Sequence, residues 1–315
     1  MPTEIRWLAS ASASCYHAVE LLERTGRLAD SKLERALRPG VADLCEFLAA
    51  ASLPAERCME HLVPLSVGIH GARQLAAAVL TKVAGPRRDA RWEPRLVEIL
   101  REVETQFHAA LPGLVDELAL RAVPLGEQWD ARGPGLLAQI GRLTEPILIV
   151  PAADVVLVQP FQGGGGRPHL LYNSVRIEAV LANPLPELPE VARLGWLISQ
   201  LNADLPMHQG DLQRTRLNEV AALAMLPVTL AAAEEVDLAR SDAHVLALAI
   251  ESWYLPLKAA ASSSGAEGQT PEMVGAPELA NTLVNWWRTY LDGKPPWNVA
   301  LAALDRMMAD AGNRQ

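Results

Sequence analysis

Hydrophobic residues recur at helical spacing along most of this chain. The stripe is clearest between residues 93 and 110, where Leu96, Ile99, Val103 and Phe107 share one face and charged residues occupy the other. Similar stripes, bounded by glycine and proline, predict helices over most of the remaining sequence. The expected helices cover residues 4–24, 31–38, 41–51, 71–84, 93–110, 112–122, 133–143, 187–202, 214–236, 242–260, 278–291 and 297–310, with a further one beginning near Pro54.

The hydrophobic period changes in the centre of the chain. The β-branched runs at 147–150 and 155–161 are typical of strands, and the turn residues 151–154 between them predict a hairpin. Residues 170–172 could add a short third strand. The expected fold class is therefore mainly α (α+β): a multi-helix protein with a small central antiparallel β-hairpin or three-stranded sheet.

One central segment, residues 173–183, fits two structures. Val175, Ile177 and Ala179 alternate with polar residues, as in a strand. The EAVLA run and the closing Asn183-Pro184 favour a helix instead, because these residues form helices well and the position before proline disfavours helical backbone. We expect a helix here, and a second one over 187–202.

Composition shifts suggest four regions along the chain. Residues 1–143 form an N-terminal helical region, and residues 144–261 hold the central hairpin with further helices. The serine- and glycine-rich stretch 262–277 is typical of a flexible linker. Residues 278–315 form a C-terminal helical pair, which we expect to pack on the same body.

Composition and charge narrow the classes of function. The chain has 315 residues, of which 50 % are hydrophobic and 21 % charged, and this balance is typical of a globular protein. The net charge of −9 disfavours nucleic acid as a partner. We expect no membrane span, because no apolar run reaches about 18 residues. Three cysteines are too few for a disulfide framework, and the first residues do not resemble a signal peptide, so we expect a soluble cytoplasmic protein.

A glycine-rich loop follows the second predicted strand. Gly163, Gly164, Gly165 and Gly166 precede Arg167, and a strand followed by free backbone N–H groups is a common setting for an anion. The loop lacks the Lys-Ser/Thr pair of a nucleotide-binding P-loop. A plain hairpin tip that needs left-handed backbone is the alternative, and we favour it.

Charged residues behind this loop are the other candidates for a site. Glu178, Glu190 and His169 could act as acid or base. The residues that could bind an anion, besides the loop and Arg167, are Asn173, Arg176 and Arg193. They would line a pocket between the loop and the helices expected over 174–202. A structural network of salt bridges would use the same residues and is the more common arrangement.

Metal and nucleophile motifs give no positive signal. The order of strand, loop and helix is that of a zinc peptidase, but the HExxH motif is missing, so only a zincin-like scaffold without its metal would fit. Cys58 and His61 lie three residues apart and are weak metal candidates. No GxSxG or SxxK motif is present. We therefore assign no metal and no cofactor.

The densest aromatic group is Trp286, Trp287, Tyr290 and Trp297. It either packs the last two helices onto the protein or offers a surface to a partner, and packing is favoured. From these patterns we expect a helical binding or scaffold module, with a protein or a small anionic ligand as partner. The alternative is a hydrolase-like enzyme or an anion-binding protein that uses the pocket behind the glycine loop. The oligomeric state is left open.

Overall fold

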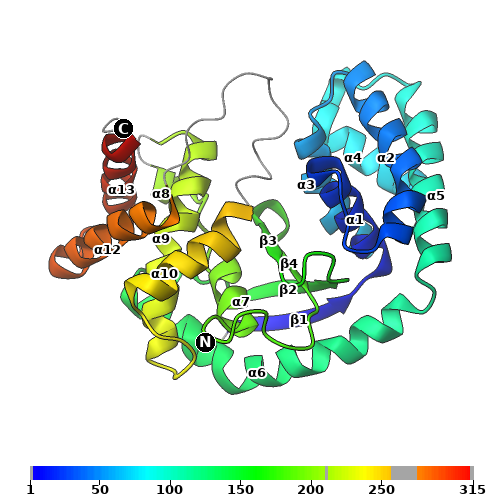
Figure 1. Cartoon of the computed structure of the whole chain (residues 1–315). Coiled ribbons are helices and arrows are strands. Elements are labelled where there is room, and N and C mark those ends of the chain that lie inside the picture. The colour runs from blue at the N-terminus through cyan, green and yellow to red at the C-terminus, as the bar shows by residue number, and fades with distance from the viewer. Residues whose placement is uncertain (1–2, 210–211, 257–274, 313–315) are drawn as a thin grey trace.

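A small mixed β-sheet lies at the centre of the protein, with helices on either side (Figure 1). The computed structural model describes residues 3–209, 212–256 and 275–312. Within these ranges the sheet has four strands in the order β1-β2-β4-β3. The strands are β1 (Glu4–Ala9), β2 (Ala152–Val158), β3 (Gly166–His169) and β4 (Ser174–Glu178). The predicted class, mainly helical with a small sheet, is confirmed.

The sheet is parallel through its centre and antiparallel at one edge. Strand β2 runs parallel to both β1 and β4, with Val155 opposite Trp7 on one side and Val175 on the other. Strand β3 pairs with β4 in the antiparallel sense, so that Gly166 faces Ile177. A parallel strand covered on both faces is apolar along its length, which is why β2 reads as a continuous β-branched run.

Three local predictions are wrong, and pairing explains each of them. Residues 4–9, expected in a helix, form β1 beside β2. The hairpin expected between 147–150 and 155–161 is absent, because Pro146–Leu148 is a 3₁₀ turn and β2 pairs with β1 and β4. The segment expected as a helix over 173–183 contains strand β4. Hydrogen bonds to β2 and β3 outweigh the helix propensity of that short run.

Five helices pack as a bundle on one side of the sheet, and we call them the N-terminal lobe (Figure 1). The sequence predicted a break in the helix at Pro39. This prediction is wrong, because helix α2 (Ser31–Ala50) continues through Pro39. The next residue, Gly40, lies so close to α5 that a Cβ there would be 2.6 Å from Val103. The lobe consists of α1 (Ala11–Thr25), α2 (Ser31–Ala50), α3 (Ala55–Gly68), α4 (Ala72–Ala84) and α5 (Trp92–Ala110), with a 3₁₀ turn at Gly85–Arg87.

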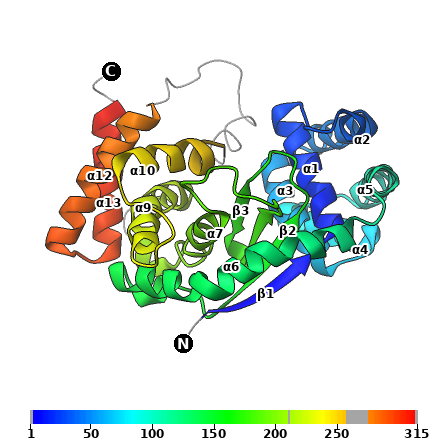
Figure 2. The same ribbon diagram turned by 60° about the horizontal axis from the view of Figure 1, so that its bottom comes forward.

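A single long helix, α6 (Leu114–Leu143), runs along the base of the molecule (Figure 1 and Figure 2). The sequence predicted two helices here, but α6 is continuous through Pro124 and Pro134. Its 30 residues span about 45 Å. It packs on β1 and β2 and then on two later helices, α7 (Glu190–Ile198) and α9 (Arg214–Glu234). Helix α6 therefore links the N-terminal lobe to the helices beyond the sheet.

The helices beyond the sheet form the C-terminal lobe. Its longest member, α9, is apolar and long enough to cross a membrane by length and composition alone, but 78 % of that window is buried within the protein, as in a core helix. The linker expected over 262–277 lies outside the described residues except for its last three. The lobe contains α7 (Glu190–Ile198), α8 (Pro206–Gln209), α9 (Arg214–Glu234), α10 (Ala243–Ala249), a π-helical turn η4 (Ile250–Tyr254), α12 (Ala276–Gly293) and α13 (Trp297–Gly312).

The aromatic group near the C-terminus belongs to the core. The rings of Trp286, Trp287, Tyr290 and Trp297 contact one another with centroids 5.4–6.1 Å apart. All four residues are buried, and the indole N–H of Trp286 donates to the carbonyl of Ala300. The cluster therefore packs α12 against α13, as the favoured interpretation of these residues predicted.

Candidate functional site

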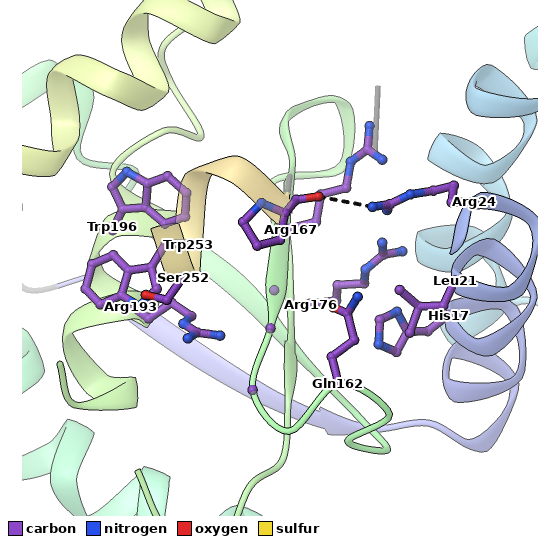
Figure 3. Close-up of a pocket in the computed structure, with 14 residues that line it drawn as sticks. His17, Leu21, Arg24, Gln162, Arg167, Arg176, Arg193, Trp196, Ser252 and Trp253 are labelled. Atoms are coloured by element: carbon purple, nitrogen blue, oxygen red, sulfur yellow. Dashed lines mark hydrogen bonds between the residues drawn. The ribbon is translucent and has the colours of Figure 1, made fainter. Parts of the chain in front are cut away.

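A cavity of about 300 Å³ lies between the two lobes at the β3 edge of the sheet (Figure 3). Helix α1 forms one wall, α7 and the π-helical turn η4 form the opposite wall, and β3, β4 and the glycine loop lie between them. π-Helical turns are rare and occur often at functional sites. The lining residues are His17, Leu21, Arg24, Gln162, Gly164, Gly165, Gly166, Arg167, Arg176, Arg193, Trp196, Ser252, Trp253 and Pro256.

Four arginines line this cavity, and no carboxylate is among the described residues that line it. Arg24 comes from α1, Arg167 from β3, Arg176 from β4 and Arg193 from α7. Arg176 and Arg193 are almost fully buried. Guanidinium groups that converge from four elements form a favourable environment for phosphate or carboxylate oxygens. The positive lining contrasts with the net charge of −9 for the whole chain.

One buried carboxylate holds three of these arginines in place. Glu20 of α1 lies behind the lining, 3.3 Å from Arg24, 2.9 Å from Arg167 and 2.5 Å from Arg176. Burial by itself raises the pKa of Glu20, but Arg176, Arg167 and Arg24 together outweigh it and hold the pKa well below its ordinary value. Glu56 adds a longer contact of 3.6 Å to Arg167. Two carboxylates facing three guanidinium groups leave positive charge at the cavity.

The glycine loop is organised by Glu178, not by an open anion site. One carboxylate oxygen of Glu178 accepts the backbone N–H groups of Phe161 and Gln162, and the other accepts the N–H of Gly164 at 2.8 Å. Burial raises the pKa of Glu178, but His17 and these backbone donors bring it below its ordinary value, so the side chain is ionised. The protein's own carboxylate therefore occupies the cradle that the sequence suggested for a bound anion.

Two of the loop glycines are required by close packing. A Cβ on Gly166 would lie 2.5 Å from Leu197 and 2.8 Å from the carbonyl oxygen of Arg176. Gly164 has φ of +129°, and a Cβ there would lie 2.6 Å from Pro184. Neither position could carry a side chain without moving these neighbours, so the close packing beside the cavity depends on glycine.

On the opposite wall, Arg193 is held by a different carboxylate. Its Nη2 atom lies 3.3 Å from Glu190, one helical turn earlier on α7, and its guanidinium lies over the ring of Trp253 at 5.8 Å. Burial raises the pKa of Glu190 to about 7, with Arg193 opposing the shift. Near neutral pH, Glu190 is thus partly protonated, which weakens its ion pair with Arg193. Glu178 is a second carboxylate whose charge acts on this guanidinium.

His17 is the imidazole of the lining. Its Nε2 lies 3.0 Å from a carboxylate oxygen of Glu178. An ionised carboxylate only accepts hydrogen bonds, so the neutral ring carries its proton on Nε2 and a lone pair on Nδ1. Burial lowers the pKa of His17, which keeps the ring neutral at pH values near 7.

Several buried donors in the cavity wall have no hydrogen-bond partner among the described residues. Buried polar groups are satisfied in the great majority of cases, so such a group of donors indicates a missing acceptor. These N–H groups match a ligand rich in oxygen atoms. They are Nε of Arg24, Nε of Arg176, Nε and Nη1 of Arg193, and Nε1 of Trp253. Nδ1 of His17 and both carboxylate oxygens of Glu190 also have no hydrogen-bond partner among the described residues, and these atoms are acceptors.

The structure brings together six of the residues proposed from the sequence as binding residues. The three that the sequence offered as acid or base lie elsewhere: Glu178 behind the loop, Glu190 behind Arg193, and His169 in the buried end of β3. The six binding candidates that line the cavity are Gly164, Gly165, Gly166, Arg167, Arg176 and Arg193.

The two remaining binding candidates, Gly163 and Asn173, lie away from the cavity, as does His169. Gly163 is exposed at the tip of the loop with φ of +80°, the left-handed backbone that the sequence predicted. The predicted hairpin tip is wrong, because the loop joins β2 to β3 and these strands are separated by β4. Asn173 is exposed at the opposite end of β4 and donates to the carbonyl of Ala152. Neither ring nitrogen of His169 has a hydrogen-bond partner within the part of the chain that the structure describes. Burial, with Arg176 and Arg167 nearby, puts the pKa of His169 well below its ordinary value.

Sequence reasoning missed the wall that α1 provides. His17, Glu20 and Arg24 lie three and four residues apart, so they share one face of α1 with Leu21. Polar residues at this spacing in a helix that is otherwise buried were a usable signal. Trp253 and Ser252 were missed because nothing in the sequence marks the π-helical turn.

Cys58 and His61 were the weak metal candidates. His61 Nδ1 lies 2.6 Å from the hydroxyl of Tyr172, and burial raises the pKa of Cys58 to about 12. No group of three or more His, Cys, Asp or Glu side chains that could hold a metal occurs within residues 3–209, 212–256 and 275–312.

Comparison of the chain with known protein families, with curated proteins and with solved structures finds no match. The chemistry of the site is therefore interpreted from its own geometry.

Proposed function

We propose that this protein binds a small anionic ligand, bearing phosphate or carboxylate groups, in the cavity between its lobes. The observation that carries the proposal is the cavity lining: four arginines from four elements and no carboxylate among the described lining residues. The buried donors without partners support it, because an anion with several oxygens would accept from them.

The size of the cavity also supports a small ligand. Pockets for drug-sized molecules measure about 300–1,000 Å³, so a space of about 300 Å³ fits a compound at the lower end of this range. Three glycines of the loop belong to the lining of the cavity.

The first experiment measures the unfolding temperature and calorimetric binding with inorganic phosphate and sulfate, in a buffer without other multivalent anions. At a ligand concentration ten times the Kd, binding stabilises the folded state by about 1.4 kcal/mol. The variant Arg24→Gln removes one lining guanidinium while Arg167 and Arg176 continue to neutralise Glu20. We expect about 10-fold weaker binding, the loss of one charge-assisted hydrogen bond.

A matched control is Arg38→Gln in the same lobe. Arg38 is 57 % exposed and pairs with Glu34 on the surface of α2, so phosphate should bind this variant as it binds the unmodified protein. Absence of stabilisation by either anion at millimolar concentration would refute the proposal.

A scaffold for a protein partner, the other expectation from the sequence, predicts a different result. In that case the arginines would only lock the two lobes together. Arg24→Gln would then lower the unfolding temperature with or without phosphate, and the calorimeter would detect no binding.

A further inference from the structure

The four arginines of the cavity form two separate groups. Arg24, Arg167 and Arg176 converge on Glu20 and belong to α1 and the sheet edge. Arg193 lies across the cavity from them, on the C-terminal lobe, with Glu190 and Trp253 as its neighbours (Figure 3). The ion pairs of Arg193 and of the other three share no carboxylate among the described residues.

The glycine loop also lines the cavity, together with the uncharged side chain of Gln162. A Cβ on Gly164 would lie 3.5 Å from Nη1 of Arg193, and one on Gly165 would lie 3.2 Å from the side-chain oxygen of Gln162. Among the described residues, these four arginines are the only arginines or lysines that line the cavity. The centre of the cavity thus offers no further cation, and the cationic groups stand at its two ends.

Each group also has buried N–H donors without a hydrogen-bond partner among the described residues. On the α1 side these are Nε of Arg24 and Nε of Arg176, and on the α7 side they are Nε and Nη1 of Arg193 with Nε1 of Trp253. A ligand with one anionic group would satisfy the donors of one wall and leave the donors of the other wall without acceptors, which is costly in a buried site.

We infer that the ligand carries two anionic groups joined by a short linker, one group bound by the arginines around Glu20 and the other by Arg193. This inference rests on the proposed anion-binding function and names the chemical class of the ligand: a bisphosphate, a phosphorylated carboxylic acid or a dicarboxylate. Because the two walls belong to different lobes, such a ligand joins the lobes when it binds.

The test compares methylphosphonate with a series of α,ω-bisphosphonates whose linkers contain one to about four carbons, in the presence of a chelator. Binding of the first group makes binding of the second intramolecular, so a linker of matching length should bind at least about 10-fold more tightly than methylphosphonate. Linkers that are too short to reach both walls should show no such gain. The length at the optimum then measures the distance that the ligand spans.

Arg193→Gln should abolish the advantage of the best bisphosphonate over methylphosphonate, because only one wall remains. Arg193→Lys keeps the charge and should retain part of the advantage. The double variant Glu190→Gln with Arg193→Gln removes both members of the buried pair, and it serves if the single variant does not fold. Arg38→Gln is again the control, with the ratio of affinities unchanged.

The outcomes separate this inference from the proposed function. If methylphosphonate and every bisphosphonate bind equally, or if Arg193→Gln weakens both kinds of ligand by the same factor, the protein has one anionic subsite and the inference is overturned. If none of the probes binds, the anion-binding function itself fails and the inference fails with it.

Discussion

Glu178 offers a sharp test of how the glycine loop is held. Its carboxylate accepts three backbone N–H groups of the loop and one imidazole N–H, and it is fully buried. Glu178→Gln keeps the shape of the side chain but replaces one oxygen by an NH₂ group. That group cannot accept, so the donors on one side of the side chain lose their partner.

The expected loss of stability follows from the hydrogen bonds on the side that carries the NH₂ group in the Glu178→Gln variant. If the NH₂ group faces the loop at Gly164, a hydrogen bond to a charged acceptor worth about 1.5–3 kcal/mol is lost and a buried N–H is left unsatisfied at about 1–3 kcal/mol. The amide avoids the desolvation cost of the carboxylate, which offsets part of this. We expect the free energy of unfolding to fall by about 2–4 kcal/mol at neutral pH, close to the upper end of ordinary substitutions.

The same substitution should change the response to acid. The pKa of Glu178 in the folded protein lies below its ordinary value. Its contribution to stability is therefore present above the unfolded pKa of about 4.3 and is lost as the pH falls through the lower folded pKa. Glu178→Gln should lack this part of the acid-induced loss of stability.

Urea denaturation at neutral and acidic pH gives the free energies, and amide hydrogen exchange at Phe161 and Gly164 reports on the loop. Glu117→Gln is the control, since Glu117 lies on the surface of α6 and its side chain is 49 % exposed. A loss below about 0.5 kcal/mol for Glu178→Gln, with exchange at Gly164 unchanged, would refute the assigned role, because that is the range of neutral surface substitutions.

Four further predictions concern the loop, the cavity and the aromatic cluster. Gly166→Ala should destabilise the protein by about 1–3 kcal/mol in urea and weaken phosphate binding, because the added methyl group collides with a backbone carbonyl and a leucine side chain. Gly163→Ala, with φ of +80° but no atom within 4 Å, should cost about 1 kcal/mol and leave phosphate binding intact. Sulfate should bind more tightly at about pH 6 than at about pH 8, because protonation of Glu190 leaves Arg193 free for the ligand. The charge of sulfate itself is constant in this range, and calorimetry of Glu190→Gln should show little of this difference. Trp286→Ala should lower the free energy of unfolding by about 3–5 kcal/mol and reduce the near-ultraviolet circular dichroism of the aromatic cluster.

Each of these has an outcome that would contradict it. Equal effects of Gly166→Ala and Gly163→Ala on phosphate binding would mean that the strand edge does not shape the cavity. An unchanged pH dependence in Glu190→Gln would assign the titration to another group. A loss below about 1 kcal/mol for Trp286→Ala would place the aromatic cluster outside the cooperative core, where truncation is cheap.

Proline was a poor guide to the helix boundaries of this protein. Pro39, Pro64, Pro124, Pro134 and Pro227 all lie inside helices. A proline in a helix removes one hydrogen bond and costs about 3 kcal/mol in an exposed helix. In α6 one buried face that continues on both sides of the prolines outweighs that cost, and in α9 burial in the core does so. The sequence shows the local penalty but not the packing that compensates for it.

Only part of the site could be predicted from the sequence, for a related reason. The glycines, Arg167, Arg176 and Arg193 lie within about 30 positions of one another, so reasoning about neighbouring elements could group them. Glu20 and Arg167, by contrast, are 147 residues apart. Their contact depends on β1 pairing in parallel with β2, which places α1 over the sheet edge. Parallel pairing has no local turn signal, because its connection here passes through all of the N-terminal lobe.

The sequence by itself determined the helical class of the protein, the position of its β centre and the glycine loop, because periodicity, β-branched runs and glycine act through local backbone preferences. Only the tertiary structure decided that residues 174–178 form a strand and that Glu178 binds the loop. It also decided that arginines from both lobes face one cavity. Those features depend on pairing and burial between distant segments, where electrostatic and packing energies exceed the small differences in local propensity.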